Sequence, residues 1–164
     1  MTSTTTALAE GAELMSNVEL TMVRQELETE KIDNVALYLK QELHGIELGL
    51  KPGASVAVAV GSRGIANLSE IVRTTVKWVL GQGWRPFIVP AMGSHGGATP
   101  EGQRAVLEHY GIKEADVGAA ILSSLEVVEL PSEGLANKVY MDKYAYEADG
   151  VIVINRIKPH TDFH

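Results

Sequence analysis

The sequence predicts an α/β fold with a mainly parallel sheet and helices on both faces. Three short apolar runs, at residues 55–60, 86–92 and 151–154, support this prediction. Each has the length and composition of a strand that is buried on both faces. The first two runs are each followed by a glycine-containing turn and then by a helix, which is the pattern of a βαβ unit.

The chain before the first strand predicts one helix. Residues 1–13 are rich in threonine, and we expect them to be disordered. Residues 14–164 are expected to form a single α/β domain. Apolar residues recur at helical spacing over residues 32–43, with Asp33 as the expected cap and Gly45 at the expected end.

Capping signals mark the helices that follow the first two strands. Asn67 and Glu70 have the spacing of a capping box at the start of one helix. At the other helix, Thr99 is a typical cap, Pro100 suits the first helical position and Glu101 puts a negative charge in the first turn. Both helices should therefore begin just beyond the carboxyl end of a strand.

The remaining segments predict short elements only. We expect strands over residues 18–27, 125–130 and 138–141, and short helices over residues 113–120 and 143–148. The strand at 138–141 is expected to be antiparallel and to lie at an edge.

Composition excludes several classes of protein. A chain of 164 residues fits one domain that buries roughly 70% of its unfolded surface. A net charge of −7 argues against a nucleic-acid partner bound through its phosphates. Without cysteine there is no disulfide, thiolate nucleophile or cysteine-ligated zinc. No apolar run approaches membrane-spanning length and no signal peptide is present, so we expect a cytoplasmic protein without membrane contact.

Three polar residues follow the three predicted strands. Arg63 and His95 each lie three residues beyond the end of a strand, and His160 lies six residues beyond the third. The carboxyl ends of neighbouring parallel strands meet at one edge of a sheet, where ligands bind. We therefore expect the three side chains to share a cleft, with both histidines partly accessible to solvent.

Two histidines beside an arginine indicate proton transfer on a small acid. One histidine can accept a proton while the other donates one, and arginine binds a carboxylate through two parallel hydrogen bonds. A structural interpretation stands beside this one: His95 lies in a tight glycine turn, Arg63 has the character of a surface charge, and His160 lies in a basic extended segment. We interpret His44 and His109, near helix ends, as structural.

Other known motifs are absent from the sequence. It contains no GxxxxGK[ST] loop, no GxGxxG, no GxSxG and no HExxH. No histidine, aspartate and glutamate cluster has the spacing of metal ligands either. The residues themselves therefore predict no metal site and identify no cofactor-binding residue.

Residues 93–101, Gly-Ser-His-Gly-Gly-Ala-Thr-Pro-Glu, resemble the Gly-x-His-x-x-x-Thr-x-Glu segment of the nickel-dependent lactate racemases. Arg63 is similar to an arginine after the first long strand of that family, and Pro159-His160 resembles its Pro-His pair. The resemblance spans about residues 20 to 164. It implies a Rossmann-like N-terminal domain of a two-domain protein, with the active site between the domains. It also implies a nickel-pincer nucleotide tethered through a lysine, with one histidine ligand to nickel.

The resemblance implies a racemase or epimerase of a small 2-hydroxy acid. His95 and His160 would form the acid/base pair, and Arg63 would bind the substrate carboxylate. One histidine would take the hydroxyl proton while the α-hydride moves to the pincer ring, and return to the other face would invert the centre. The family's acidic residue before the arginine is Val60 here, and its arginine after the first histidine is Gly96. These departures suggest a hydroxy acid other than lactate.

The cofactor lysine and the nickel-binding histidine of that family lie downstream of the Pro-His pair, and this sequence ends at His164. We therefore expect a truncated N-terminal part of a parent enzyme. By itself it should fold, hold no nickel cofactor, lack activity, and self-associate through apolar surface left bare. Two other functions stay open: a module that binds a carboxylate or phosphate without turnover, and a metal-independent acid/base isomerase or lyase.

Overall fold

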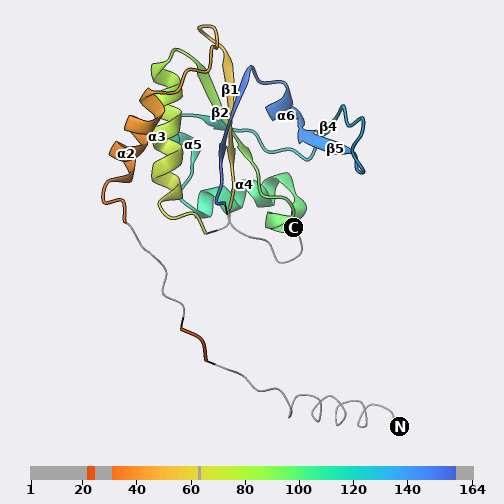
Figure 1. Cartoon of the computed structure of the whole chain (residues 1–164), viewed down its shortest axis with the longest axis horizontal. Helices are drawn as coiled ribbons and strands as arrows, with labels where there is room; N and C mark the ends of the chain where they lie inside the picture. Colours follow the sequence, from red (N-terminus) through yellow and green to blue (C-terminus); the bar gives the residue numbers. More distant parts are fainter. Residues whose placement is uncertain (1–21, 25–30, 63, 158–164) are drawn as a thin grey trace. The chain divides into compact units, whose positions relative to one another are not determined.

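The computed structural model describes residues 22–24, 31–62 and 64–157, and from Ile32 onward these residues belong to one compact unit. Its main sheet contains four strands in the order β3-β2-β1-β6, with all neighbours parallel. Figure 1 labels its two central strands, β2 and β1. The bounds are β1 Ser55–Val60, β2 Arg85–Pro90, β3 Ala120–Ile121 and β6 Gly150–Ile154. This confirms the α/β fold predicted from the three apolar runs.

The three long strands end level with one another. Val60 at the end of β1 pairs with Pro90 of β2 on one side and with Ile154 of β6 on the other. The loops that leave these strands therefore start from the same edge of the sheet. The expectation that the three predicted strands are parallel neighbours is confirmed.

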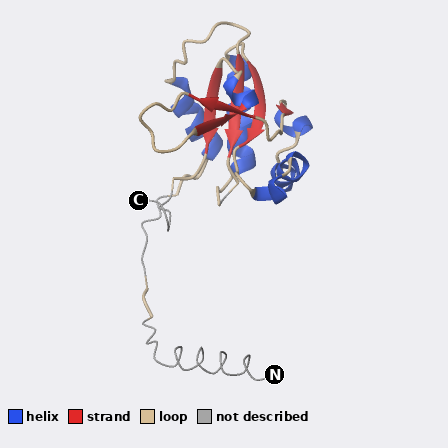
Figure 2. Ribbon diagram, turned by 90° about the vertical axis from the view of Figure 1, so that its right-hand side faces the viewer, coloured by secondary structure: helices blue, strands red, loops and turns tan. Residues whose placement is uncertain are grey.

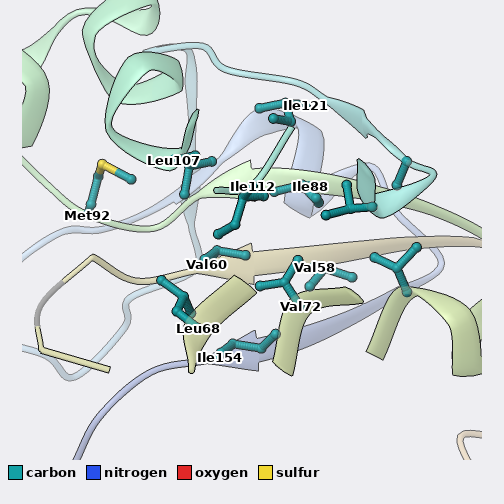
Figure 3. Close-up of a cluster of buried hydrophobic side chains, with 13 residues drawn as sticks. Val58, Val60, Leu68, Val72, Ile88, Met92, Leu107, Ile112, Ile121 and Ile154 are labelled. Atoms are coloured by element: carbon teal, nitrogen blue, oxygen red, sulfur yellow. The ribbon is translucent and has the colours of Figure 1, made fainter. Parts of the chain in front are cut away.

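Large side chains of β1 face one layer of helices. That layer contains α3 (Leu68–Gly81), α4 (Pro100–His109) and α5 (Glu114–Val117), and α2 (Val35–His44) packs against α3. Valine side chains of β1 meet Leu68 and Val72 of α3 and Leu107 of α4 in the main hydrophobic core, of which Figure 3 labels ten members. All of these side chains are buried, so this face carries most of the apolar burial that stabilises the fold.

Small side chains of β1 face the opposite layer. Ala57 and Ala59 pack against Ala145 of the short helix α6 (Lys143–Tyr146). Alanines on both sides let the helix backbone approach the strand closely. Met141, from the strand before α6, packs in the same cluster.

The chain reverses its direction of winding at β1. From β1 it passes through α3 to β2, and then through α4 and α5 to β3, with the helices on the first face. It then crosses the second face through β4 (Val127–Leu130), β5 (Val139–Asp142) and α6, and enters β6 on the far side of β1. Figure 2 shows these strands in red and the helices in blue. A topological switch point of this kind lies between β1 and β6, which is where open α/β sheets bind ligands.

One feature of the predicted strands is wrong. The run at residues 151–154 is not buried on both faces, because β6 lies at the edge of the described sheet and α6 is too short to cover it. Val151 is 37% exposed and Val153 is 65% exposed. The strand expected at 138–141 is antiparallel and at an edge, as predicted, and it pairs with β4 in a separate two-stranded sheet.

Local details of the helices also differ. Asn34, not Asp33, caps α2, since its side chain accepts a hydrogen bond of 2.9 Å from the Leu37 amide. Asn67 forms no capping box, because it has φ 55° and its side chain makes no capping hydrogen bond. The helix expected over residues 113–120 is shorter, and Gly118 ends it with φ 79°. The sequence did not predict β3.

Several sequence predictions lie outside the part of the chain that the structure describes. Residues 1–13, which we expect to be disordered, lie outside the described ranges. Most of the strand expected over residues 18–27 lies outside them as well. Within the described ranges, no helix has the length and apolar character that crossing a membrane requires.

Candidate functional site

The loops that leave β1, β2 and β6 enclose a cleft of about 430 Å³ at the carboxyl edge of the sheet. Its position coincides with the switch point between β1 and β6. The lining comes from all three loops and consists of Ser62, Ala91, Met92, Gly93, Ser94, His95, Asn155 and Arg156.

His95 begins the short 3₁₀ helix η1 (His95–Ala98), between β2 and α4, and is half-buried. Gly96 and Gly97 follow with φ values of 64° and 68°, a left-handed conformation that glycine adopts without strain. The chain then enters α4 at Thr99, whose hydroxyl oxygen accepts a hydrogen bond of 3.1 Å from the Gly102 amide. The predicted cap is confirmed, and so is the placement of His95 in a turn that opens onto a cleft.

The first turn of α4 holds the His95 loop in place. A Cβ on Gly96 would lie 2.5 Å from the backbone nitrogen of Gln103, and a Cβ on Gly102 would overlap the carbonyl of Gly96. Both positions therefore need glycine. The buried side chain of Gln103 also donates a hydrogen bond of 2.8 Å to the Gly93 carbonyl. These contacts fix the backbone on both sides of His95.

Ser62 is a hydrogen-bond partner of the His95 ring. Its hydroxyl oxygen lies 2.6 Å from Nδ1 of His95, and the serine is only 5% exposed. If Nδ1–H donates to the hydroxyl oxygen, Nε2 carries the lone pair of a base. If the hydroxyl donates to Nδ1, Nε2 carries a proton instead. Either way, Ser62 sets the orientation of the ring.

The loop after β6 packs on the turn after β1. The Gly61 amide donates a hydrogen bond of 2.9 Å to the carbonyl of Ile154. A Cβ on Gly61 would lie 2.8 Å from Oδ1 of Asn155, and one on Gly64 would lie 3.2 Å from Nη1 of Arg156. Asn155 Oδ1 also accepts a hydrogen bond of 2.8 Å from the backbone of Arg156. Gly61 and Gly64, in the turn after β1, thus leave room for the side chains of Asn155 and Arg156 at the mouth of the cleft.

Sequence reasoning missed Ser62, Asn155 and Arg156. A hydroxyl in the same turn as the candidate arginine, and a polar pair directly after the VIVI strand, are the signals that mark them. No periodicity or motif pairs Ser62 with His95, because 33 residues separate them. Their contact depends on the pairing of β1 with β2.

Arg63 and His160 lie outside the described residues. Of the three side chains expected to gather, only His95 can be located in the cleft. The shared site of His95, His160 and Arg63 therefore stays a prediction.

The described lining of the cleft suits an anion. It contains no aspartate or glutamate, and Arg156 is its permanent cation. The hydroxyls of Ser62 and Ser94 add hydrogen-bonding groups. An acid such as a carboxylate therefore meets no like charge from these residues.

A second hollow of about 520 Å³ lies beside His95 and is lined by Gly96, Ala105, Val106, His109 and Tyr110. His109 is the last residue of α4, and its ring meets that of Tyr110 at 5.9 Å. His44 is likewise the last residue of α2. Both histidines thus lie where a helix dipole favours a positive charge, as the sequence predicted.

The nickel group implied by the resemblance does not fit the described residues alone. Such a group needs a lysine tether and a histidine ligand to nickel, and the described lining includes no lysine. No group of three or more histidine, cysteine, aspartate or glutamate side chains in the described ranges is placed to hold a metal ion.

Comparison with protein-family models, with curated proteins and with solved structures gives no match to this chain.

Proposed function

We propose that this chain contributes an acid/base histidine and an anion-binding cleft to a racemase or epimerase of 2-hydroxy acids. The observation that carries the proposal is the contact between His95 and the buried Ser62, in a cleft at the switch point of the sheet. A histidine oriented through one ring nitrogen is the usual arrangement of a general acid or base. The resemblance adds the substrate class and the nickel-pincer nucleotide, which remain part of the proposal.

In the proposed reaction, His95 moves the proton of the substrate hydroxyl. With Nδ1 held by Ser62, Nε2 is the ring nitrogen that exchanges this proton. When Nε2 is protonated, both ring nitrogens are donors, and the Ser62 oxygen can accept from Nδ1–H. Ser62 thereby supports the charged ring without moving. Arg63 is proposed to hold the carboxylate, and His160 to act on the opposite face of the substrate.

The anion-suited lining also favours the second function that the sequence left open. A module that binds a carboxylate or phosphate needs the same cation, hydroxyls and glycine turn, but no proton transfer. Turnover of the bound acid distinguishes the two functions, whereas affinity for the acid does not.

Chiral chromatography after incubation with enantiopure 2-hydroxy acids tests the proposal. The full-length protein that carries this sequence is assayed in D₂O, with and without added nickel-pincer nucleotide. Inversion with the α-hydrogen retained supports the proposed function. Inversion with exchange of the α-hydrogen for deuterium, independent of the nucleotide, indicates the metal-independent isomerase. Saturable binding without inversion of any acid indicates the binding module and contradicts the proposal.

His95→Ala should lower turnover by about 10²- to 10⁴-fold, the usual contribution of general acid–base catalysis. His44→Ala is the matched control, because His44 is exposed at the end of α2 and does not line the cleft. Turnover by the control should equal that of the wild type. Near-normal turnover by His95→Ala would exclude the role that we assign to this residue.

A further inference from the structure

Arg156 is a cation at the mouth of the cleft, without a carboxylate partner in the described part of the chain. It lies two residues beyond the end of β6 and is exposed. The ion pairs among the described residues are Arg104–Glu114, Lys138–Glu129 and Lys143–Glu126, so none involves Arg156. An exposed arginine at the mouth of a cleft that meets no carboxylate of the described residues is available to a ligand anion.

The guanidinium of Arg156 is held against the turn after β1. A Cβ on Gly64 would lie 3.2 Å from Nη1 and 3.3 Å from Cζ, and Gly64 has φ 57°. The absence of a side chain at Gly64 therefore leaves room for the guanidinium there. Asn155, whose side chain lies against Gly61, fixes the preceding residue in the same way. This charge therefore lines the same cleft as Ser62 and His95.

The chain carries a net negative charge, so a ligand with several negative groups needs a cation at its binding site. The net charge is −7, so a ligand with two negative groups is repelled at long range. Arg63 is the residue proposed to hold the carboxylate next to the reacting carbon. If Arg63 holds the carboxylate as proposed, Arg156 is in excess for a substrate with a single carboxylate. The cleft, of about 430 Å³, also exceeds what a three-carbon acid fills.

We propose that Arg156 binds a second anionic group, so that the substrate is a 2-hydroxy acid with a negative charge on its side chain. This inference rests on the proposed function for the 2-hydroxy acid, but the subsite itself is a property of the cleft. The second group is a carboxylate or a phosphate, both of which match the arginine fork. Arg156 is thus assigned a role in specificity, separate from the proton transfer at His95.

Isothermal titration calorimetry with three acids tests the subsite without turnover. Lactate carries one negative group, malate adds a second carboxylate, and 3-phosphoglycerate adds a phosphate. The full-length wild type should bind malate or 3-phosphoglycerate roughly 10- to 100-fold more tightly than lactate, the range expected for one charge-assisted contact. Which of the two binds more tightly identifies the second group. The preference should weaken as salt is added, because the site is exposed.

Arg156→Ala should abolish this preference, because it weakens the binding of malate and 3-phosphoglycerate far more than the binding of lactate. Arg156→Lys should retain part of it, because the charge remains while the planar fork is lost. Lys77→Ala is the control for net charge, since Lys77 is an exposed residue of α3 outside the cleft. The control should keep the full preference.

Two results would overturn the inference. One is equal affinity of the wild type for all three acids. The other is an equal loss of affinity for lactate and for the dianions in Arg156→Ala, which would show that Arg156 only supports the fold of the loop. Neither result depends on racemisation. If the protein prefers dianions through Arg156 but inverts none of them, the subsite is supported and the proposed function is contradicted.

Discussion

At the scale of single residues, the contact between Ser62 and His95 is the most informative one in the cleft. Two loops that leave neighbouring strands bring a buried hydroxyl to 2.6 Å from an imidazole nitrogen. His95 was predicted from the sequence because a histidine in a glycine turn after a strand is a recognisable pattern. Ser62 was not, since a serine in a turn has many ordinary explanations.

Ser62→Ala should lower turnover by about 10- to 100-fold and change the Michaelis constant little, because it misplaces the ring without removing it. Nitrogen-15 NMR of the imidazole provides an independent measurement. The wild type should show one dominant tautomer, and the variant a mixture. Ser132→Ala, which removes a hydroxyl from the loop between β4 and β5, outside the cleft, should change neither turnover nor the ring signals. Unchanged ring signals in Ser62→Ala would show that the hydroxyl does not orient His95.

At the scale of elements, the packing of η1 on the start of α4 decides where His95 lies. Two backbones meet there at Gly96 and Gly102, and the side chain of Gln103 ties the helix to Gly93. The sequence predicted the helix and its cap, because capping is local. It did not predict the contact between the two glycines.

Gly102→Ala should lower the free energy of unfolding by about 1–3 kcal/mol, since the new methyl group overlaps backbone that cannot rotate away. Gly81→Ala is the matched control. It also lies in a helix, but a Cβ there meets nothing within 4 Å, and the change should be neutral or stabilise by up to about 1 kcal/mol. Urea denaturation compares the two. Equal stability of Gly102→Ala and the wild type would mean that the glycine contact is not needed.

Asp149 joins β6 to β1 at the end of the sheet opposite the cleft. Its carboxylate accepts hydrogen bonds of 2.7 Å from both the amide and the hydroxyl of Ser55. The amide bond first, and then the hydroxyl, hold the pKa of Asp149 below its ordinary value of 3.8. The carboxylate therefore contributes stability above that value, and the contribution is lost as the pH falls through the lowered pKa.

Asp149→Asn should consequently lower the melting temperature near neutral pH, and the difference from the wild type should shrink as the pH falls below about 4. Calorimetric melts between about pH 7 and pH 3 measure this difference. Asp33→Asn, at an exposed position, is the control and should show no such trend. A difference that stays constant with pH would indicate that the effect does not arise from the ionised carboxylate.

At the scale of the whole molecule, β6 leaves apolar surface at the edge of the described sheet. Val151 and Val153 lie on the same face as Ala57 and Ala59, and α6 does not cover them. The strand sequence GVIVI contains no charge of the kind that protects edge strands from pairing with another chain. The self-association expected from the sequence stays a prediction, and this edge is where we expect it to begin.

Val153→Lys should raise several-fold the protein concentration at which the sample stays monodisperse, because a charge on an edge strand opposes edge-to-edge pairing. Its effect on stability should stay within about 0.5 kcal/mol, as for most surface changes. Dynamic light scattering and sedimentation velocity measure the first effect. Val127→Lys, at a similarly exposed valine of β4, is the control. An equal gain from both variants would mean that β6 is not the origin of the association.

The sequence alone determined the fold class, the three long strands, the capped start of α4 and the placement of His95 after β2. Each of these follows from interactions within a few residues, such as an apolar run or a cap, and such interactions leave a periodic or local signal. Only the tertiary structure decided the strand order β3-β2-β1-β6, the exposure of β6, the pairing of Ser62 with His95 and the position of Arg156 over Gly64. These four features depend on which face of the sheet each crossover covers and on contacts between segments distant in the sequence. Strand pairing brings such residues together, and no local sequence pattern records it.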